Sequence, residues 1–218
     1  MERNGMPMIS PHYSAQEYIN LGLCEDSDED TWNKAIEMVK DRFYSRFFSV
    51  IRYLSTDWRT RQYNKEKAER NGFAIMALNC LLIDAFYQFE AGVKDTKGVN
   101  QKTYTAFLNN HFSNMFCSEP AGQNTLASLF YDRIRNGILH SAETKGYSML
   151  SCEGGAPISY INKGTPSEGI RVELGMFSDA LKNFFYDYIR ELQNNNITLR
   201  SNFIKKMNFI CNVDPPEF

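Results

Sequence analysis

Residues 126–140 read LASLFYDRIRNGILH, and the spacing of their apolar residues decides how this part of the chain folds. Four of these residues recur every fourth position: Leu126, Phe130, Ile134 and Ile138. Such spacing predicts a helix over about residues 122–142. Asn136-Gly137 between apolar residues is also a strong signal for a tight turn, so a hairpin at 134–138 stays open as the alternative.

Helical spacing extends outward from this stretch in both directions. We expect long helices at about 28–54, 68–92 and 101–116, a further helix from 176, and a last one at 198–211. The segment 68–92 is apolar almost all round, which suits the centre of a bundle or an oligomer interface. Near the start of the chain, Ser14 and Glu17 fit a capping box that begins a short helix.

The period changes between the fourth helix and the next. Three short runs with β-branched and aromatic residues, separated by glycine and proline, lie within about 147–174. They predict a small antiparallel sheet inserted after the fourth helix. The expected fold is therefore mainly α, a helical bundle with core helices at about 28–142 and 176–211. We expect a single domain over residues 1–218.

Composition excludes several classes of function. A net charge of −2 gives no global basic field, so nucleic acid would have to bind at a local patch. The five cysteines are scattered and odd in number, with no CxxC or Cys/His cluster, so neither a disulfide framework nor a zinc site is expected. We therefore expect a cytoplasmic protein without a metal or cofactor. No apolar stretch approaches a membrane span uninterrupted, and no signal peptide is expected.

The predicted fourth helix carries the residues with the most chemistry. Arg135 can hold a phosphate through its planar guanidinium, and His140 can transfer a proton near neutral pH. Asn136 lies beside the arginine and can orient the phosphate or the imidazole. By composition alone, about 0.015 matches to Arg-Asn-x-x-x-His are expected in this chain. The pattern therefore predicts a site that cleaves RNA without a metal ion.

With this Arg135-Asn136-x-x-x-His140 pattern on a helix that follows other long helices, the chain resembles the HEPN superfamily over about residues 28–145 and a later helix. Many of these helical-bundle proteins are ribonucleases of toxin, phage-defence and RNA-processing systems. The resemblance implies an endoribonuclease in which the RNA 2′-hydroxyl attacks the adjacent phosphorus. It further implies a homodimer with two motifs facing each other, and a neutralising antitoxin or regulatory partner.

Two more residues are candidates for a supporting role. Arg133 is a second match to the arginine of the family pattern. Asp84 is a carboxylate on the largely apolar 68–92 helix, and a buried carboxylate needs a partner such as Arg135 or His140. His12, in the irregular start of the chain, has no feature that favours a functional role.

Two other classes of function remain open. The chain can be a HEPN-type module that binds nucleic acid or nucleotide without cleavage. It can also be a helical oligomerisation or regulatory subunit whose target is a protein.

Overall fold

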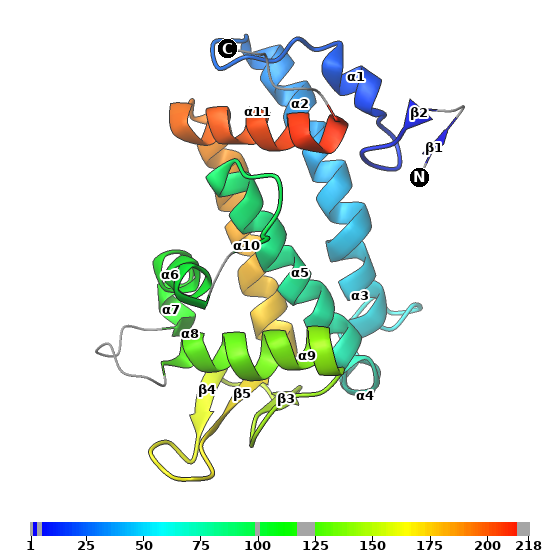
Figure 1. Cartoon of the computed structure of the whole chain (residues 1–218). Helices are drawn as coiled ribbons and strands as arrows, with labels where there is room; N and C mark the ends of the chain where they lie inside the picture. Colours follow the sequence, from blue (N-terminus) through cyan, green and yellow to red (C-terminus); the bar gives the residue numbers. More distant parts are fainter. Residues whose placement is uncertain (1, 4–5, 99–100, 117–124, 213–218) are drawn as a thin grey trace. The chain divides into compact units, whose positions relative to one another are not determined.

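The structure, a computed structural model, describes residues 2–3, 6–98, 101–116 and 125–212. It is mainly helical, as the sequence predicts (Figure 1). The helices are α1 (Ala15–Ile19), α2 (Glu29–Phe43), α3 (Ser49–Ser55), α4 (Lys65–Arg70), α5 (Gly72–Ala91), α6 (Gln101–His111), α7 (Ser113–Phe116), α8 (Leu126–Leu129), α9 (Asn136–Ser141), α10 (Leu174–Gln193) and α11 (Ile197–Cys211). Two π-helical segments, η1 (Tyr44–Phe48) and η2 (Phe130–Arg135), join α2 to α3 and α8 to α9.

The chain forms two compact units, each built from separate stretches of sequence. Unit 1 comprises residues 1–50, 84–96 and 185–218, and unit 2 comprises residues 51–83 and 97–184. Helices α5 and α10 contribute their two ends to different units. The expectation of a single domain over the whole chain stays a prediction.

Aromatic packing forms the core of unit 1. The Asp28 carboxylate accepts a hydrogen bond from the Thr31 amide at 2.7 Å and so caps the start of α2. From α2, the Phe43 ring stacks on Phe185 of α10 and Phe86 of α5, with centroids 4.9 and 5.5 Å apart. The capping box predicted for α1 is also present.

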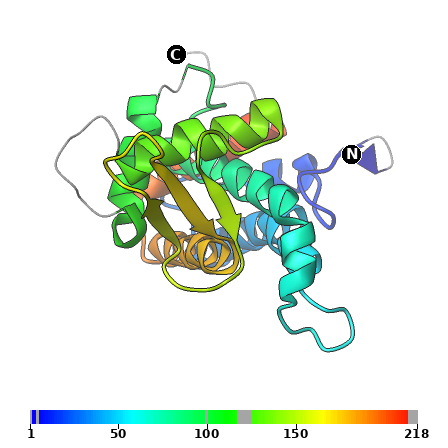
Figure 2. The ribbon, with the colours of Figure 1, turned by 90° about the horizontal axis from the view of Figure 1, so that it is seen from below.

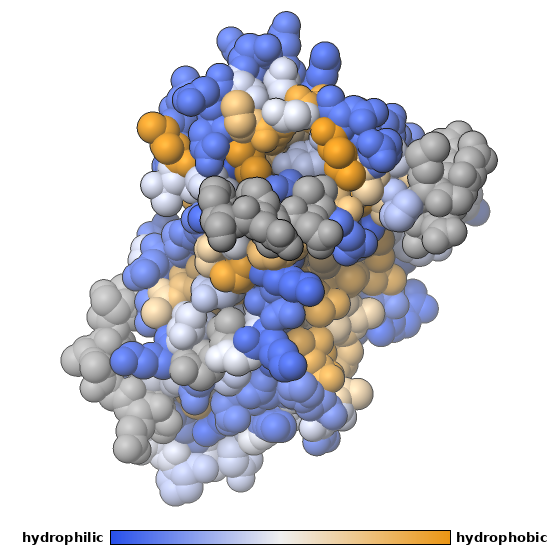
Figure 3. Space-filling view, turned by 45° about the horizontal axis from the view of Figure 1, so that its top comes forward, coloured by the Kyte–Doolittle hydropathy of each residue, from blue (hydrophilic) through white to orange (hydrophobic). Residues whose placement is uncertain are grey.

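Helix α5 is long and apolar enough to cross a membrane by length and composition alone, but core helices pass the same test. More than half of its apolar window is buried inside the structure. Phe73 and Leu81 are among its exposed side chains. On the face shown in Figure 3, hydrophobic residues gather in separate areas between hydrophilic ones.

The predicted sheet is present in unit 2, but its pairing is mixed. Strands β3 (Met149–Ser151), β4 (Ile158–Ile161) and β5 (Gly169–Glu173) form a sheet in the order β3-β5-β4. Strands β4 and β5 are antiparallel, whereas β3 runs parallel to β5. The expectation of a wholly antiparallel insertion was therefore wrong, because β5 inserts between the two strands that precede it in the chain.

The sheet and the helix that carries the candidate motif lie against each other, as Figures 1 and 2 both show. The Phe130 ring of this helix stacks on Phe177 of α10 with centroids 5.1 Å apart and meets Phe116 edge-on at 5.6 Å. On α5, the Asn79 amide donates a hydrogen bond to the Ser178 hydroxyl at 2.9 Å. The Phe130 contacts fix the motif helix within unit 2 and so position its polar residues, while the Asn79 hydrogen bond joins α5 to α10.

Candidate functional site

The candidate motif lies on one continuous helical stretch formed by α8, η2 and α9. Thr125 caps its start, since its hydroxyl accepts a hydrogen bond from the Ser128 amide at 3.1 Å. The stretch ends at Ala142, which adopts a left-handed conformation at φ 56°. The helix is thus confirmed over the hairpin alternative; residues 122–124 of the predicted range lie outside the described residues.

A π-helical turn lies directly before the motif. Segment η2 ends at Arg135, and regular α-helix resumes at Asn136. Phe130 and Ile134 are both buried, so the wide turn is packed against the core of unit 2. Such wide turns recur at functional sites because the extra residue redirects the side chains around it.

Arg135 lies in a partly buried aromatic setting. Its Nη1 donates a hydrogen bond to the Asn136 Oδ1 atom at 3.0 Å. Its guanidinium carbon lies 5.6 Å from the ring centroid of Tyr131 and 5.9 Å from that of Tyr104, on α6. A guanidinium at these distances from aromatic faces gains favourable electrostatic attraction. Asn136 and the two rings therefore orient the cation, whereas the sequence suggested that Asn136 orients the phosphate or the imidazole.

His140 has a different environment. Its side chain is exposed, and it makes no hydrogen bond to the described residues. On a helix with 3.6 residues per turn, five positions separate two side chains by about 140° around the axis and about 7.5 Å along it. Arg135 and His140 of one chain therefore point in different directions from the same helix.

The chain's own backbone explains why a glycine occupies position 137 within this helix. A Cβ atom at this position would lie 2.4 Å from the Glu143 carbonyl oxygen and 3.3 Å from the Lys145 Cγ atom. The segment that follows Ala142 folds back over this side of α9, and the Glu143 amide donates to the Gly137 carbonyl at 3.4 Å. The space beside Gly137 is therefore filled by the backbone of the same chain, rather than by a second motif helix.

This close approach predicts that Gly137→Ala destabilises the protein. Alanine gains about 1 kcal/mol of helix propensity. The clash with a backbone carbonyl costs about 1–3 kcal/mol and lies at the upper end here, because the backbone cannot simply rotate away. Urea unfolding should therefore give a lower free energy of unfolding for Gly137→Ala.

Gly72→Ala is the matched control for this measurement. Its Cβ would lie 3.1 Å from the Leu174 Cδ1 atom, which is the end of a flexible side chain. We expect this variant to keep or gain stability. A Gly137→Ala protein as stable as Gly72→Ala would show that the 143–145 segment moves away at little cost.

The two supporting candidates have other surroundings. The Arg133 guanidinium donates a hydrogen bond to the Glu168 carbonyl, and the Arg133 carbonyl accepts one from the Lys145 amide at 2.9 Å. Arg133 therefore holds two loops of unit 2 against the helix. Asp84 is buried and belongs to unit 1, so its pairing with Arg135 or His140 stays a prediction.

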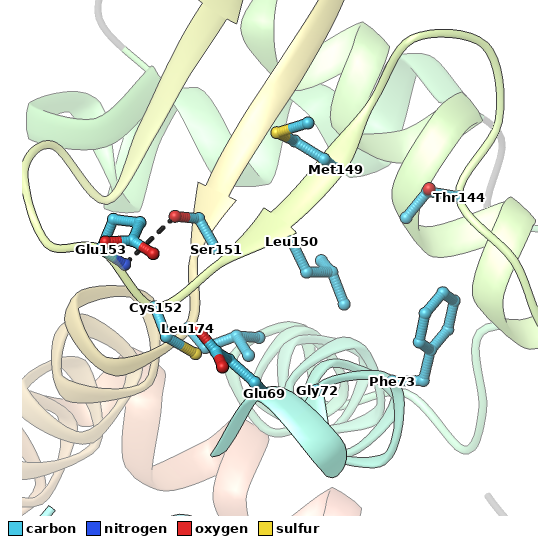
Figure 4. Close-up of a pocket in the computed structure, with 10 residues that line it drawn as sticks. All are labelled: Glu69, Gly72, Phe73, Thr144, Met149, Leu150, Ser151, Cys152, Glu153 and Leu174. Atoms are coloured by element: carbon cyan, nitrogen blue, oxygen red, sulfur yellow. Dashed lines mark hydrogen bonds between the residues drawn. The ribbon is translucent and has the colours of Figure 1, made fainter. Parts of the chain in front are cut away.

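A pocket of about 470 Å³ also lies in unit 2, between β3 and the start of α5 (Figure 4). Leu150 and Phe73 line it from the strand and the helix, and the Glu153 amide in its lining donates to the Ser151 hydroxyl at 3.2 Å. Ten residues line it: Glu69, Gly72, Phe73, Thr144, Met149, Leu150, Ser151, Cys152, Glu153 and Leu174. The motif residues are not among them, so this pocket is separate from the Arg135 side chain.

The sequence did not predict one polar pair in unit 1. The His12 Nδ1 atom lies 2.9 Å from the Asp41 Oδ1 atom, and the His12 amide donates to the Asp41 Oδ2 atom at 3.2 Å. Burial raises the pKa of Asp41, but hydrogen bonds from Ser10 and His12 outweigh it and lower the pKa overall. The separation of 29 positions along the chain leaves no local signal for the pair. Asp41 thereby anchors the segment before α1 to α2.

Comparison with known proteins adds no assignment. No protein-family model, no curated protein and no solved structure matches the chain. Within the described residues, no three His, Cys, Asp or Glu side chains are grouped in a way that could hold a metal ion. Any functional assignment therefore depends on the geometry around Arg135 and His140.

Proposed function

We propose that this protein is a metal-independent endoribonuclease of the HEPN type. The observation that carries the proposal is the setting of Arg135. Asn136 and the Tyr131 and Tyr104 rings orient its cation. Arg135 lies at the end of a π-helical turn, on the same helical stretch as the exposed His140. A fixed, partly buried cation suits charge stabilisation at phosphorus, and an exposed imidazole can transfer a proton.

In the proposed reaction the RNA 2′-hydroxyl attacks the adjacent phosphorus and the P–O5′ bond breaks. The 2′-oxygen loses its proton as it bonds to phosphorus, and the departing 5′-oxygen gains one. His140 would accept the first proton or donate the second. Arg135 would stabilise the charge on the phosphoryl oxygens through two parallel N–H donors. The products are a 2′,3′-cyclic phosphate and a 5′-hydroxyl, with no water or metal consumed in this step.

The proposal includes a HEPN-like bundle and a homodimer. One histidine supplies one proton-transfer group, whereas attack and departure each need one. A second copy would supply the other imidazole, and a twofold interface brings the same patch from both subunits together. The separation of about 140° between Arg135 and His140 supports this, because Arg135 of one chain could then act beside His140 of the other.

Cellular context is part of the same proposal. A ribonuclease active in its own cell needs restraint, so a neutralising antitoxin or regulatory partner is included, as in toxin or phage-defence systems. The scattered cysteines fit a reducing cytoplasm.

A second candidate function is a nucleic-acid or nucleotide binding module without cleavage. The same angular separation favours it, since within one chain Arg135 can hold a phosphate that His140 does not reach. The two candidates differ in whether any phosphodiester bond is broken.

The test is an incubation of purified protein with total cellular RNA, with and without a chelator. We expect cleavage in both samples, 5′ fragments that end in 2′,3′-cyclic phosphate, and no cutting of DNA, which lacks the 2′-hydroxyl. Loss of activity in the chelator, or equal cutting of DNA, would contradict the proposed mechanism. Binding without cleavage would favour the module.

A further inference from the structure

The loop that joins α3 to α4 has a defined shape. It projects from the ends of these two helices in Figure 2. Thr56 and Tyr63 form an antiparallel bridge at its base. Inside it, the Asp57 amide donates to the Gln62 carbonyl and the Arg61 amide donates to the Asp57 carbonyl, both at 2.9 Å. We call residues 56–63 the Trp58 loop.

The Asp57 side chain holds this loop together. Its Oδ1 atom accepts hydrogen bonds from the Arg59 and Thr60 amides at 2.8 and 2.9 Å. The Thr60 and Arg59 amides lower the pKa of Asp57, so the carboxylate stays ionised. The loop is therefore arranged before any ligand binds, which reduces the entropy lost on binding.

Two large aromatic side chains are displayed around this loop. Trp58 is 73% exposed and Tyr53, on α3, is 68% exposed. Each carries a cation over its ring: the Arg59 guanidinium carbon lies 4.7 Å from the Trp58 ring centroid, and the Lys67 Nζ atom lies 4.4 Å from that of Tyr53. Exposure of such rings to water is unfavourable unless another surface covers them.

The surrounding charge is positive although the chain as a whole is not. Residues 52–70 contain six Lys and Arg against three Asp and Glu, a net charge of +3, whereas the whole chain has −2. Lys65 is paired with Glu153, its Nζ atom lying 2.6 Å from Oε1. The remaining arginines include Arg61, which adopts a left-handed conformation at φ 58°, where glycine or asparagine is usual.

We propose that the Trp58 loop and Tyr53 form a binding surface for single-stranded RNA. Bases stack on exposed aromatic rings, each worth about 1–3 kcal/mol, while neighbouring cations follow the phosphates. A duplex hides its base faces, so the exposed rings favour single strands. The choice of RNA over DNA rests on the proposed function, because the loop offers no contact that tells a 2′-hydroxyl from hydrogen. The surface belongs to unit 2, as does the motif helix.

Fluorescence anisotropy with a labelled 12-nucleotide oligouridine and the matching oligodeoxythymidine tests this surface. The DNA probe cannot be cleaved through a 2′-hydroxyl, so its binding is independent of catalysis. We expect Trp58→Ala to weaken binding of both probes about 10-fold, which corresponds to about 1.4 kcal/mol. Tyr53→Ala should have a smaller effect, and Arg59→Gln with Arg61→Gln should reduce the salt dependence of binding.

The matched control is Tyr147→Ala, because Tyr147 is also an aromatic residue of unit 2 and is 59% exposed. It should bind both probes like the wild type. The chain has two tryptophans, of which Trp58 is exposed and Trp32 is buried. Stacking should therefore quench the wild-type emission, and Trp58→Phe should remove this quenching while most of the affinity remains.

Equal affinity of Trp58→Ala and wild type for the oligonucleotides would overturn the proposal. So would tighter binding of a 12-base-pair duplex than of the single strands, or Trp58-dependent binding of a protein or of anionic vesicles without affinity for the probes. The two proposals fail separately. Trp58-dependent binding without RNA cleavage would support the binding surface and contradict the proposed ribonuclease activity. RNA cleavage with unchanged binding by Trp58→Ala would support the ribonuclease activity and contradict the binding surface.

Discussion

Replacement of His140 by alanine should lower the rate of RNA cleavage about 10²–10⁴-fold, because the variant loses a proton-transfer group. The His140 side chain is exposed, so its removal should leave the fold intact. Single-turnover cleavage of a short oligoribonucleotide at saturating protein measures the chemical step apart from binding. Circular dichroism and thermal unfolding check the fold.

The matched control for this variant is His111→Ala. His111 is an exposed histidine of the same unit, at the end of α6, where its ring packs against Phe107 and Phe184. It should cleave RNA at nearly the wild-type rate. Unchanged cleavage by His140→Ala would remove the histidine from the mechanism, and added imidazole should restore part of the activity if its role is proton transfer.

Replacement of Arg135 by lysine should lower the rate nearly as much as replacement by alanine, about 10²–10³-fold. Lysine keeps the charge but loses the planar fork that contacts Asn136 and can bind two phosphoryl oxygens. It also loses the flat surface that lies near the Tyr131 and Tyr104 rings. The same single-turnover assay measures this effect, together with the affinity for an uncleavable oligonucleotide.

Arg190→Lys is the control, since Arg190 is exposed on α10 and pairs with Asp187. It should retain wild-type turnover. A near-normal cleavage rate for Arg135→Lys would show that Arg135 contributes its positive charge alone and not its planar guanidinium. A loss of affinity without a loss of single-turnover rate would favour the binding module over the ribonuclease.

The long helices were predictable because their apolar residues recur at helical spacing, whereas the short α4, which buries Ala68 alone, was not expected. The predicted range of 28–54 matches the run of α2, η1 and α3 from residue 29 to 55, and 68–92 contains α5. Strand pairing was less predictable. The runs that form β3, β4 and β5 are visible in the sequence, but their order in the sheet depends on long-range contacts. One such contact is the 3.2 Å hydrogen bond from the Ile170 amide to the Ser148 hydroxyl.

The candidate site shows the same division between local and distant information. The sequence places Arg135, Asn136 and His140 on one helix, and the structure has them there. It does not indicate that Tyr104, from another helix, lies against the Arg135 cation. Nor does it indicate that Glu143 closes over Gly137, since a glycine in a helix signals close approach without naming the neighbour. The Asp57 carboxylate that shapes the Trp58 loop was likewise hidden in a polar run.

The π-helical turn at 130–135 has a consequence for the phase of the motif helix. A four-residue repeat on a regular α-helix drifts by about 40° at each step, so residues 126, 130, 134 and 138 would wind away from a flat core. The wide turn takes up one extra residue and corrects this drift, which keeps Phe130 and Ile134 both buried. A chain of the same length that wound as a regular α-helix through this segment would lose that correction. Its equivalents of Asn136 and His140 would then point about 100° away from their present directions, and the same short motif would face a different surface.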